Sequence, residues 1–370
     1  MKALVRDLVR AGACQGYSVL RTFGLQDTKF PPVNFVVERA DWAIRWVGNY
    51  VCEGIEAEHP GTASVTTNPA PIVDRVVHFG SQYMWLAWGS HMARSNRFVT
   101  SFFHGKPEDG PDVARHIDAF VESVPRLSKI VTGASLVERR LLDWGVPREK
   151  LVKIPIGCDT NLFKPPTLDQ RRNARIQLGI PDDHTCIGSF QKDGVGWEDG
   201  MEPKLIKGPD VFIDAVRKLA ERRPVFVLLT GPARGYVRLG LERHGIPYRH
   251  DFLSDYRDMV PYYHALDLYL VTSREEGGPM ALMESMATHV PVVSTRVGQA
   301  EDLLSGMENN GLVEINDVEE MCERALSLLS ATPEQRTARA IKARETVVQG
   351  FDWHHIARQH YEQVYRPLLK

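Results

Sequence analysis

Two glutamates at a fixed spacing mark the stretch of this sequence that is best suited to chemistry. Residues 275–284 read EEGGPMALME, so Glu276 and Glu284 stand eight positions apart around two glycines and a proline. Glycine lets a ligand approach the backbone closely, and proline suits the start of a helix. The N–H groups of a helix start favour an anion, and a carboxylate can accept hydrogen bonds from two neighbouring hydroxyl groups. The structural alternative is a helix that carries capping acids and a surface glutamate.

The elements that must position these glutamates alternate short β-rich runs with helical patterns. The predicted strands are 33–39, 63–67, 75–80, 97–105, 129–135, 150–157, 185–190, 224–231, 267–273 and 291–298. This alternation is typical of parallel α/β layers, whose ligands bind at the carboxyl ends of the strands. The glutamates follow the strand at 267–273, so we expect them at such an edge.

A turn-rich segment at 158–169, with a Pro-Pro pair, interrupts the periodicity and predicts a domain boundary. We therefore expect an N-terminal Rossmann-like domain over 1–160 and a C-terminal one over 161–350. Residues 351–370 have apolar and aromatic side chains at helical spacing, and we expect this helix to pack back on the first domain. Two such sheets facing one another would leave a central cleft for ligands.

Composition excludes several classes of protein. The net charge of −2 gives no sign of a nucleic-acid partner, and the five scattered cysteines favour neither a zinc site nor a disulfide framework. Scattered free cysteines suit a reducing, cytoplasmic compartment. Residues 1–20 place Lys2, Arg6 and Arg10 among apolar residues, as in an amphipathic helix. Such a helix either contacts an acidic membrane surface as a peripheral element or packs on its own domain.

The region around the two glutamates resembles a known family. The stretch SREEGGPMALMESMATHVPVVSTRVGQAEDLL (273–304) is similar to the E-x7-E signature of the family 4 retaining glycosyltransferases, which have the GT-B fold. Further landmarks occur in the family's order: SFFHG, IPIGCDTNLFKP, KGPDVFIDAVRKL, LLTGP and YYHALDLYLVTS. The resemblance extends from about residue 33 to the C-terminal helix.

The resemblance implies an activity. The family moves a sugar from a nucleotide-sugar to a hydroxyl group of a glycan, a glycolipid or a small molecule, with retention and without a metal or cofactor. The N-terminal domain would bind the acceptor, which is a glycan or a lipid-linked molecule. The C-terminal domain would bind the nucleotide-sugar donor.

The resemblance also implies roles for individual residues. Glu284 would hold the ribose hydroxyls, and Glu276 would face the transferred sugar together with the backbone of Gly277, Gly278, Pro279 and Met280. His104, which ends SFFHG, would hydrogen-bond the same sugar. The family usually has an aromatic residue where this chain has Gly277, so the identity of the donor sugar stays open.

In the family, an arginine and a lysine stabilise the departing nucleoside diphosphate. Lys207, in KLIKGPD, matches that lysine, while Gln191–Lys192 stands at the place of the arginine. Lys192 supplies a point charge without the bidentate fork of arginine, and Lys204 is another candidate for the phosphate. Ordinary solvated charge is the alternative for all three lysines.

The segment between Lys192 and Lys207 is longer than the family's usual turn. It reads DGVGWEDGMEPKLI and is either a lid that carries Trp197 over the donor or an inserted surface loop.

Three other functions remain as alternatives. Replacement of the arginine and the altered glycine loop favour a non-catalytic sugar-nucleotide-binding protein, and the fold also suits a sugar-nucleotide epimerase or hydrolase. A plain NAD oxidoreductase is disfavoured, because no G-x-G-x-x-G follows a strand and opens a helix.

Overall fold

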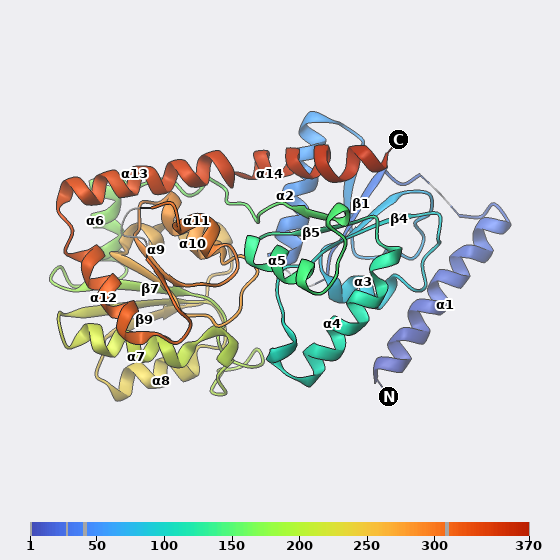
Figure 1. Cartoon of the computed structure of the whole chain (residues 1–370). Coiled ribbons are helices and arrows are strands. Elements are labelled where there is room, and N and C mark those ends of the chain that lie inside the picture. Colours follow the sequence, from blue (N-terminus) through green and yellow to red (C-terminus); the bar gives the residue numbers. More distant parts are fainter. Residues whose placement is uncertain (1, 27–28, 40–42, 308–310, 370) are drawn as a thin grey trace. The chain divides into compact units, whose positions relative to one another are not determined.

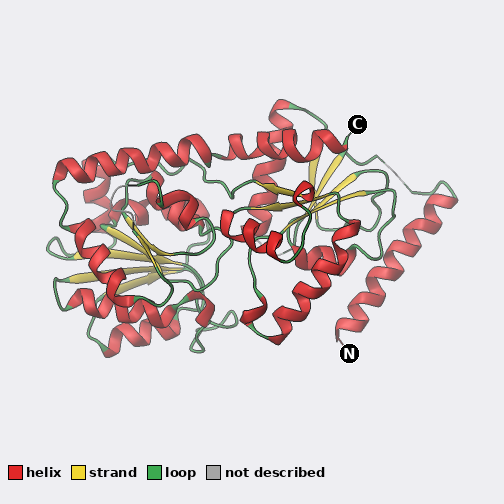
Figure 2. Ribbon diagram, in the orientation of Figure 1, coloured by secondary structure: helices red, strands yellow, loops and turns green. Residues whose placement is uncertain are grey.

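A computed structural model describes residues 2–26, 29–39, 43–307 and 311–369. The chain divides into two compact units, which we describe separately: Met1–Ile156 with Trp353–Lys370, and Gly157–Asp352. Each unit contains one six-stranded parallel sheet with helices on its faces (Figure 1, Figure 2). The predicted α/β class with two Rossmann-like sheets is therefore confirmed.

The sheet of the first unit has the strand order β2-β1-β3-β4-β5-β6. Its strands are β1 (Val33–Val36), β2 (Ala63–Thr66), β3 (Val76–Phe79), β4 (Arg97–Ser101), β5 (Lys129–Thr132) and β6 (Leu151–Lys153). Its helices include α1 (Lys2–Thr22), α2 (Ala43–Glu58), α3 (Gln82–Trp88), α4 (Pro111–Ser123) and α5 (Ser135–Asp143). The central strands are buried on both faces, which explains their nearly continuous apolar runs.

The C-terminal helix α14 (Trp353–Gln359) belongs to the first unit and packs against α2. A side chain on Gly54 would place its Cβ 2.5 Å from that of Ala357, so glycine is what allows the two helices to approach so closely. Tyr50 stacks on Trp353 with ring centroids 4.9 Å apart.

The sheet of the second unit has the order β12-β11-β10-β7-β8-β9. Its strands are β7 (Thr185–Phe190), β8 (Val225–Thr230), β9 (Tyr248–Asp251), β10 (Leu268–Val271), β11 (Val292–Thr295) and β12 (Leu312–Val313). This is the 3-2-1-4-5-6 order of doubly wound sheets, and the direction of winding reverses between β7 and β10. Ligands of such sheets bind outside the carboxyl ends of the strands at this switch point.

Helices cover both faces of the second sheet. They are α6 (Leu168–Gln177), α7 (Pro209–Ala220), α8 (Gly235–Arg243), α9 (Val260–Ala265), α10 (Met280–Ala287), α11 (Ala300–Leu304), α12 (Val318–Leu329) and α13 (Pro333–Gly350). One core forms where α7, α8 and α12 cover one face of the sheet, while α9, α10 and α11 lie on the other face (Figure 1). Among the described residues, no helix is long and apolar enough to cross a membrane.

The strands β9 and β12 were not predicted from the sequence. The residues of β9 read YRHD and are only half-buried, since the strand lies at the edge of the sheet. The strand β12 has just two residues, at the opposite edge. Neither strand has the buried apolar run by which the others were found.

One glycine brings the start of α7 against the end of β10. Gly208 has a φ of +62°, and a Cβ on it would lie 1.9 Å from the carbonyl oxygen of Thr272. The hydroxyl of Thr272 donates to the carbonyl of Gly208 at 2.9 Å. Arg274 fastens the same junction with two hydrogen bonds to Asp210, at 2.9 and 2.7 Å. The turn Leu205–Lys207 is thereby held beside the loop that follows β10.

We expect Gly208→Ala to separate these two elements. The left-handed backbone alone costs an alanine about 1–2 kcal/mol, and the contact with Thr272 adds to that. The free energy of unfolding should therefore fall by about 2 kcal/mol or more, measured by denaturant titration. Gly306→Ala is the control, because a Cβ at that position would have no other atom within 4 Å. Equal stability of the two variants would contradict this account.

Candidate functional site

The candidate site lies where the loops after β7 and β10 meet at the switch point of the second sheet. Strand β7 ends at Phe190 and leads into Gln191–Lys192, while β10 leads into Ser273 and Glu276. The side chain of Gln191 donates to the carbonyl of Lys207 at 3.2 Å and so joins the first loop to the turn before α7.

Lys207 and Glu276 form an ion pair. Nζ of Lys207 lies 2.6 Å from Oε1 of Glu276, and the hydroxyl of Ser273 donates to the same oxygen at 2.8 Å. Both side chains of the ion pair are mostly buried. The structure therefore brings together two residues that the sequence placed 69 positions apart, and it orients the lysine through the carboxylate.

Lys192 and Lys204 lie close to this pair. The pKa of Lys204 is lowered mainly by loss of hydration and next by the nearby charge of Lys207. Part of the Lys204 side chain remains exposed. Lys192 repels it further, while Glu276 opposes the shift. The positive charges of Lys207 and Lys192 therefore act on Lys204, and such a concentration of positive charge favours an anion.

Glu284 is a buried carboxylate. Its exposed fraction is 3%, and it accepts hydrogen bonds from the hydroxyl groups of Tyr256 and Tyr263. Burial raises its pKa to about 7, and the two tyrosine hydroxyls act in the opposite direction. Phe163, from the NLFKP motif, packs edge-on against both tyrosine rings with centroids 5.5 Å apart. This environment rules out the surface-glutamate alternative.

The glycine loop Gly277–Gly278 is held against the turn after β11. A Cβ on Gly298, whose φ is +48°, would lie 2.7 Å from the carbonyl oxygen of Gly277. The helix α10 begins at Met280, with Pro279 preceding it in an extended conformation. Pro279 was predicted at the first helical position, but it lies one residue before the helix. The loop still leads directly into α10.

Arg234 is a site residue that the sequence analysis missed. It is fully buried and donates to the carbonyls of Ser189 and Gln191 at 2.7 and 2.9 Å. Its Nε lies 2.9 Å from the buried carboxylate of Asp193, without hydrogen-bond alignment, so this contact is an ion pair. Arg234 thus fixes the path of the chain on both sides of Lys192. The only sequence signal was its place in LLTGPAR, just beyond β8.

His104 belongs to the first unit. The predicted strand 97–105 ends at Ser101, so the histidine lies in the loop beyond β4, where its side chain is exposed. Its carbonyl accepts a hydrogen bond from Gln82 at 3.2 Å. Its contact with a sugar stays a prediction. Within the described ranges, no group of three or more histidine, cysteine or acidic residues is arranged to hold a metal ion.

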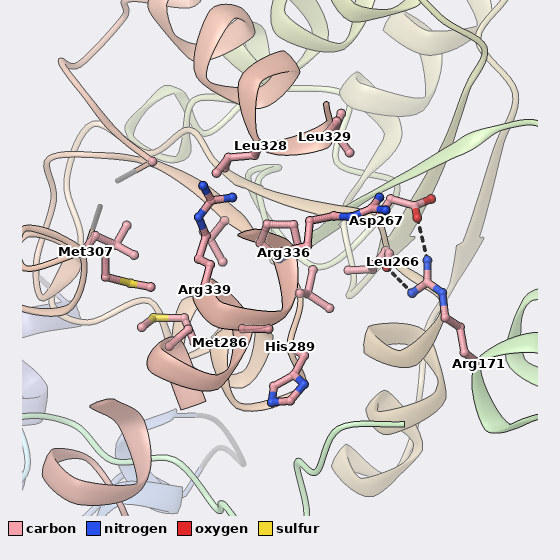
Figure 3. Close-up of a pocket in the computed structure, with 17 residues that line it drawn as sticks. Arg171, Leu266, Asp267, Met286, His289, Met307, Leu328, Leu329, Arg336 and Arg339 are labelled. Carbon is pink, nitrogen blue, oxygen red and sulfur yellow. Dashed lines mark hydrogen bonds and ion pairs between the residues drawn. The ribbon is translucent and has the colours of Figure 1, made fainter. Parts of the chain in front are cut away.

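A cavity of about 290 Å³ lies near the amino ends of the strands of the second sheet, at the opposite end from the candidate site (Figure 3). It is lined by residues that precede β10 and β11, such as Asp267 and Pro291, and by one face of α13. Arg171 bonds to Asp267 at 2.6 Å at its rim (Figure 3). Because Glu276 and the lysines follow the carboxyl ends of the strands, this cavity is not the predicted site.

Comparison with known proteins matches the segment that holds much of the site. Residues 200–331 match the family model described as "Glycosyl transferases group 1". The lipopolysaccharide core biosynthesis mannosyltransferase LpsB of Rhizobium meliloti is 28% identical over 194 residues, which cover 50% of this chain and 52% of the relative. The D-inositol 3-phosphate glycosyltransferase of Corynebacterium aurimucosum is 28% identical over 278 residues, which cover 71% and 62%. The chain thus spans about half to three-fifths of the length of these relatives.

Solved structures match nearly the whole chain. Anabaena Alr3699/HepE, in complex with UDP and glucose, has a TM-score of 0.73 and 17% identity, covering 90% of this chain and 99% of that one. Sucrose-phosphate synthase from Thermosynechococcus elongatus has a TM-score of 0.73 and 16% identity, covering 92% and 99%. At these identities the likeness concerns the fold. The chain therefore has the GT-B fold, and its residues 200–331 are similar to the glycosyl transferases group 1 family.

Proposed function

We propose that this protein is a retaining, metal-independent glycosyltransferase that moves a sugar from a nucleotide-sugar to a hydroxyl acceptor. One observation carries the proposal: Lys207 pairs with Glu276 at the switch point of the sheet, and Glu284 lies in the helix that follows, in a segment that matches the glycosyl transferases group 1 model. Glu284 supplies acceptors for a ribose, the lysines supply charge for a diphosphate, and Glu276 faces the sugar. These three groups match the three parts of a nucleotide-sugar.

The lysines provide most of the stabilisation of the leaving group. Enzymes accelerate reactions by at least a million-fold, which requires roughly 8 kcal/mol, whereas a helix terminus contributes about 0.3–1 kcal/mol. Preorganised cations aimed at the departing phosphate supply the larger share. Lys207 is oriented by Glu276, and Lys192 with Lys204 takes the place of the family's arginine.

The sugar end of the donor is held by Glu276 and by the backbone of 277–280. The configuration of the anomeric carbon is retained because the acceptor attacks it from the same face that the phosphate leaves. The acceptor oxygen bonds to the anomeric carbon as the bond to the phosphate oxygen breaks, and the acceptor's proton passes to the departing phosphate. No side-chain nucleophile is needed.

The relatives suggest the first ligands to try. Anabaena HepE is described in complex with UDP and with UDP-glucose, and LpsB is named a mannosyltransferase of lipopolysaccharide core biosynthesis. These names support a nucleotide-sugar donor and a glycan or lipid-linked acceptor for this chain. A non-catalytic binder is the second candidate, because Lys192 lies over the ring of Trp197, 4.0 Å from its centroid, and Lys207 is paired with Glu276.

We expect nucleotide binding to depend on Glu284. In a thermal-shift panel of UDP, GDP, ADP, dTDP and CMP, one nucleotide should stabilise the wild type by several degrees. A ligand at one hundred times its Kd contributes about 2.7 kcal/mol. Glu284→Ala should lose the shift, because the ribose hydroxyls lose their acceptor, while the exposed Glu345→Ala should keep it. No shift with any nucleotide would reject the donor site. Binding without turnover for any acceptor would favour the non-catalytic candidate.

We also expect the affinity for a nucleotide-sugar such as UDP-glucose, whose phosphates do not titrate in this range, to rise between pH 6 and pH 8. The pKa of Glu284 is about 7, and the ionised carboxylate is the stronger acceptor for ribose hydroxyls. Glu284→Gln, which stays neutral, should show no such rise in a calorimetric titration across this range. A wild-type affinity that does not change with pH would contradict the assignment of Glu284 to the ribose.

The same pKa has a consequence for stability. The folded protein holds a proton on Glu284 up to about pH 7, whereas the unfolded chain releases it near pH 4.5. The contribution of Glu284 to stability is therefore present below pH 4.5 and is lost as the pH rises to about 7. Glu284→Gln should gain in Tm relative to the wild type over that window, which provides a check without ligand.

The proposed lipid-linked acceptor suits a peripheral contact between α1 and an acidic membrane surface. One face of α1 packs on its own unit, where Cys14 is buried and Arg10 lies over the ring of Trp88. The opposite face exposes Val5, Leu8, Val9 and Val19 to solvent, and Phe23, just beyond the helix, is exposed as well. Such an exposed apolar face is typical of helices that lie in a membrane interface.

We expect Leu8→Asp combined with Phe23→Asp to weaken sedimentation with phosphatidylglycerol vesicles several-fold. Both residues are exposed, so folding should be unaffected. The matched control is Ile176→Asp, which changes an equally exposed residue in the other unit. Unchanged sedimentation of the double variant would reject the membrane contact.

A further inference from the structure

The segment that follows Lys192 folds as a hairpin. Gly194 and Pro203 form an antiparallel bridge. The amide of Lys204 donates to the carbonyl of Asp193 at 2.7 Å, and the amide of Val195 to that of Glu202 at 2.9 Å. Residues 193–204 are therefore an ordered hairpin whose two ends carry lysines of the anion site, Lys192 and Lys204.

The hairpin is fastened to the start of α8. The amide of Gly235 donates to the carbonyl of Asp199 at 2.6 Å, and that of Tyr236 to Gly200 at 3.0 Å. A Cβ on Gly200, whose φ is +72°, would lie 2.3 Å from the backbone of Ala233. With Asp193 paired to Arg234, these contacts hold the hairpin at its base and along one side. It is a fixed part of the donor domain rather than a freely moving lid.

The tip of the hairpin exposes apolar side chains beside the lysine cluster. Val195, Trp197 and Met201 are all exposed, and 64% of Trp197 is accessible to solvent. Tryptophan is well buried on average, and a group of exposed apolar residues marks a binding surface. Lys192 places its Nζ 4.0 Å from the centroid of the Trp197 ring, which fixes the indole next to the anion site.

We propose that Trp197 stacks against the pyranose ring of a substrate and thereby helps to determine sugar specificity. The C–H face of a pyranose is apolar, and its hydrogens are weakly positive because of the neighbouring oxygens. The face of an indole is apolar and negative, so the two surfaces are complementary. Since Lys192 joins the indole to the phosphate site, a sugar beside the phosphate comes within reach of Trp197. This inference rests on the proposed function, in which donor and acceptor both carry sugars.

Calorimetry separates the two sources of the sugar. UDP and UDP-glucose are titrated into the wild type, Trp197→Ala, Trp197→Phe and the hairpin control Val195→Ala. Methyl α-D-glucopyranoside and methyl α-D-mannopyranoside are titrated in the presence of UDP. If Trp197 contacts the donor sugar, Trp197→Ala lowers the affinity for UDP-glucose about threefold to tenfold, as expected for one aromatic contact. The affinity for UDP then stays unchanged. If it contacts the acceptor, the loss appears with a methyl glycoside instead. Trp197→Phe retains most of the affinity in either case.

Two results would overturn the inference. Trp197→Ala with unchanged affinity for every sugar ligand would show that the indole is not a sugar platform. An equal loss of UDP and UDP-glucose affinity would show that Trp197 acts only through Lys192. Failure of the proposed function is distinct from both, because the wild type would then bind no nucleotide in the thermal-shift panel.

Discussion

The close approach of Gly208 to the carbonyl of Thr272 is the constraint on which the candidate site depends. Any side chain at position 208 would collide with the end of β10, so glycine allows the turn before α7 to lie directly against that strand. Lys207 then reaches Glu276, and Gln191 joins the loop after β7 to the same turn. The switch point of the sheet only offers a place for a ligand. This junction brings the charged groups to it.

The two glutamates of one motif are placed in opposite environments. Glu276 is paired with a cation, whereas Glu284 is buried among aromatic rings and hydrogen-bonded to two tyrosine hydroxyls. Their environments differ because of where each residue lies. Glu276 is in the loop beyond the carboxyl end of β10, whereas Glu284 is in the middle of helix α10, which packs on a face of the sheet. One motif thereby provides an ion-paired carboxylate and a carboxylate poised to change its charge near neutral pH.

Positive charge in the candidate site comes from lysines. The inserted hairpin carries Lys192 and Lys204 at its two ends. Loss of hydration and then the charge of Lys207 lower the pKa of Lys204, and the charge of Lys192 adds a smaller repulsion. Holding like charges together requires a rigid support, which the buried pair of Arg234 and Asp193 supplies. The insertion therefore has a structural reason: its length returns the chain to the anion site with a second cation.

The α/β class, ten of the twelve strands within the described residues and the local motif of Glu276 and Glu284 were predictable from the sequence alone. These depend on apolar runs and on residues close together in the chain, which a single sequence displays. Other contacts became known only from the folded structure: Lys207 pairs with Glu276, Tyr256 and Tyr263 donate to Glu284, and Arg234 supports the chain around Lys192. The partners in these contacts lie between 21 and 69 residues apart. Their meeting depends on how strands are ordered and which way side chains point, and no local pattern encodes either.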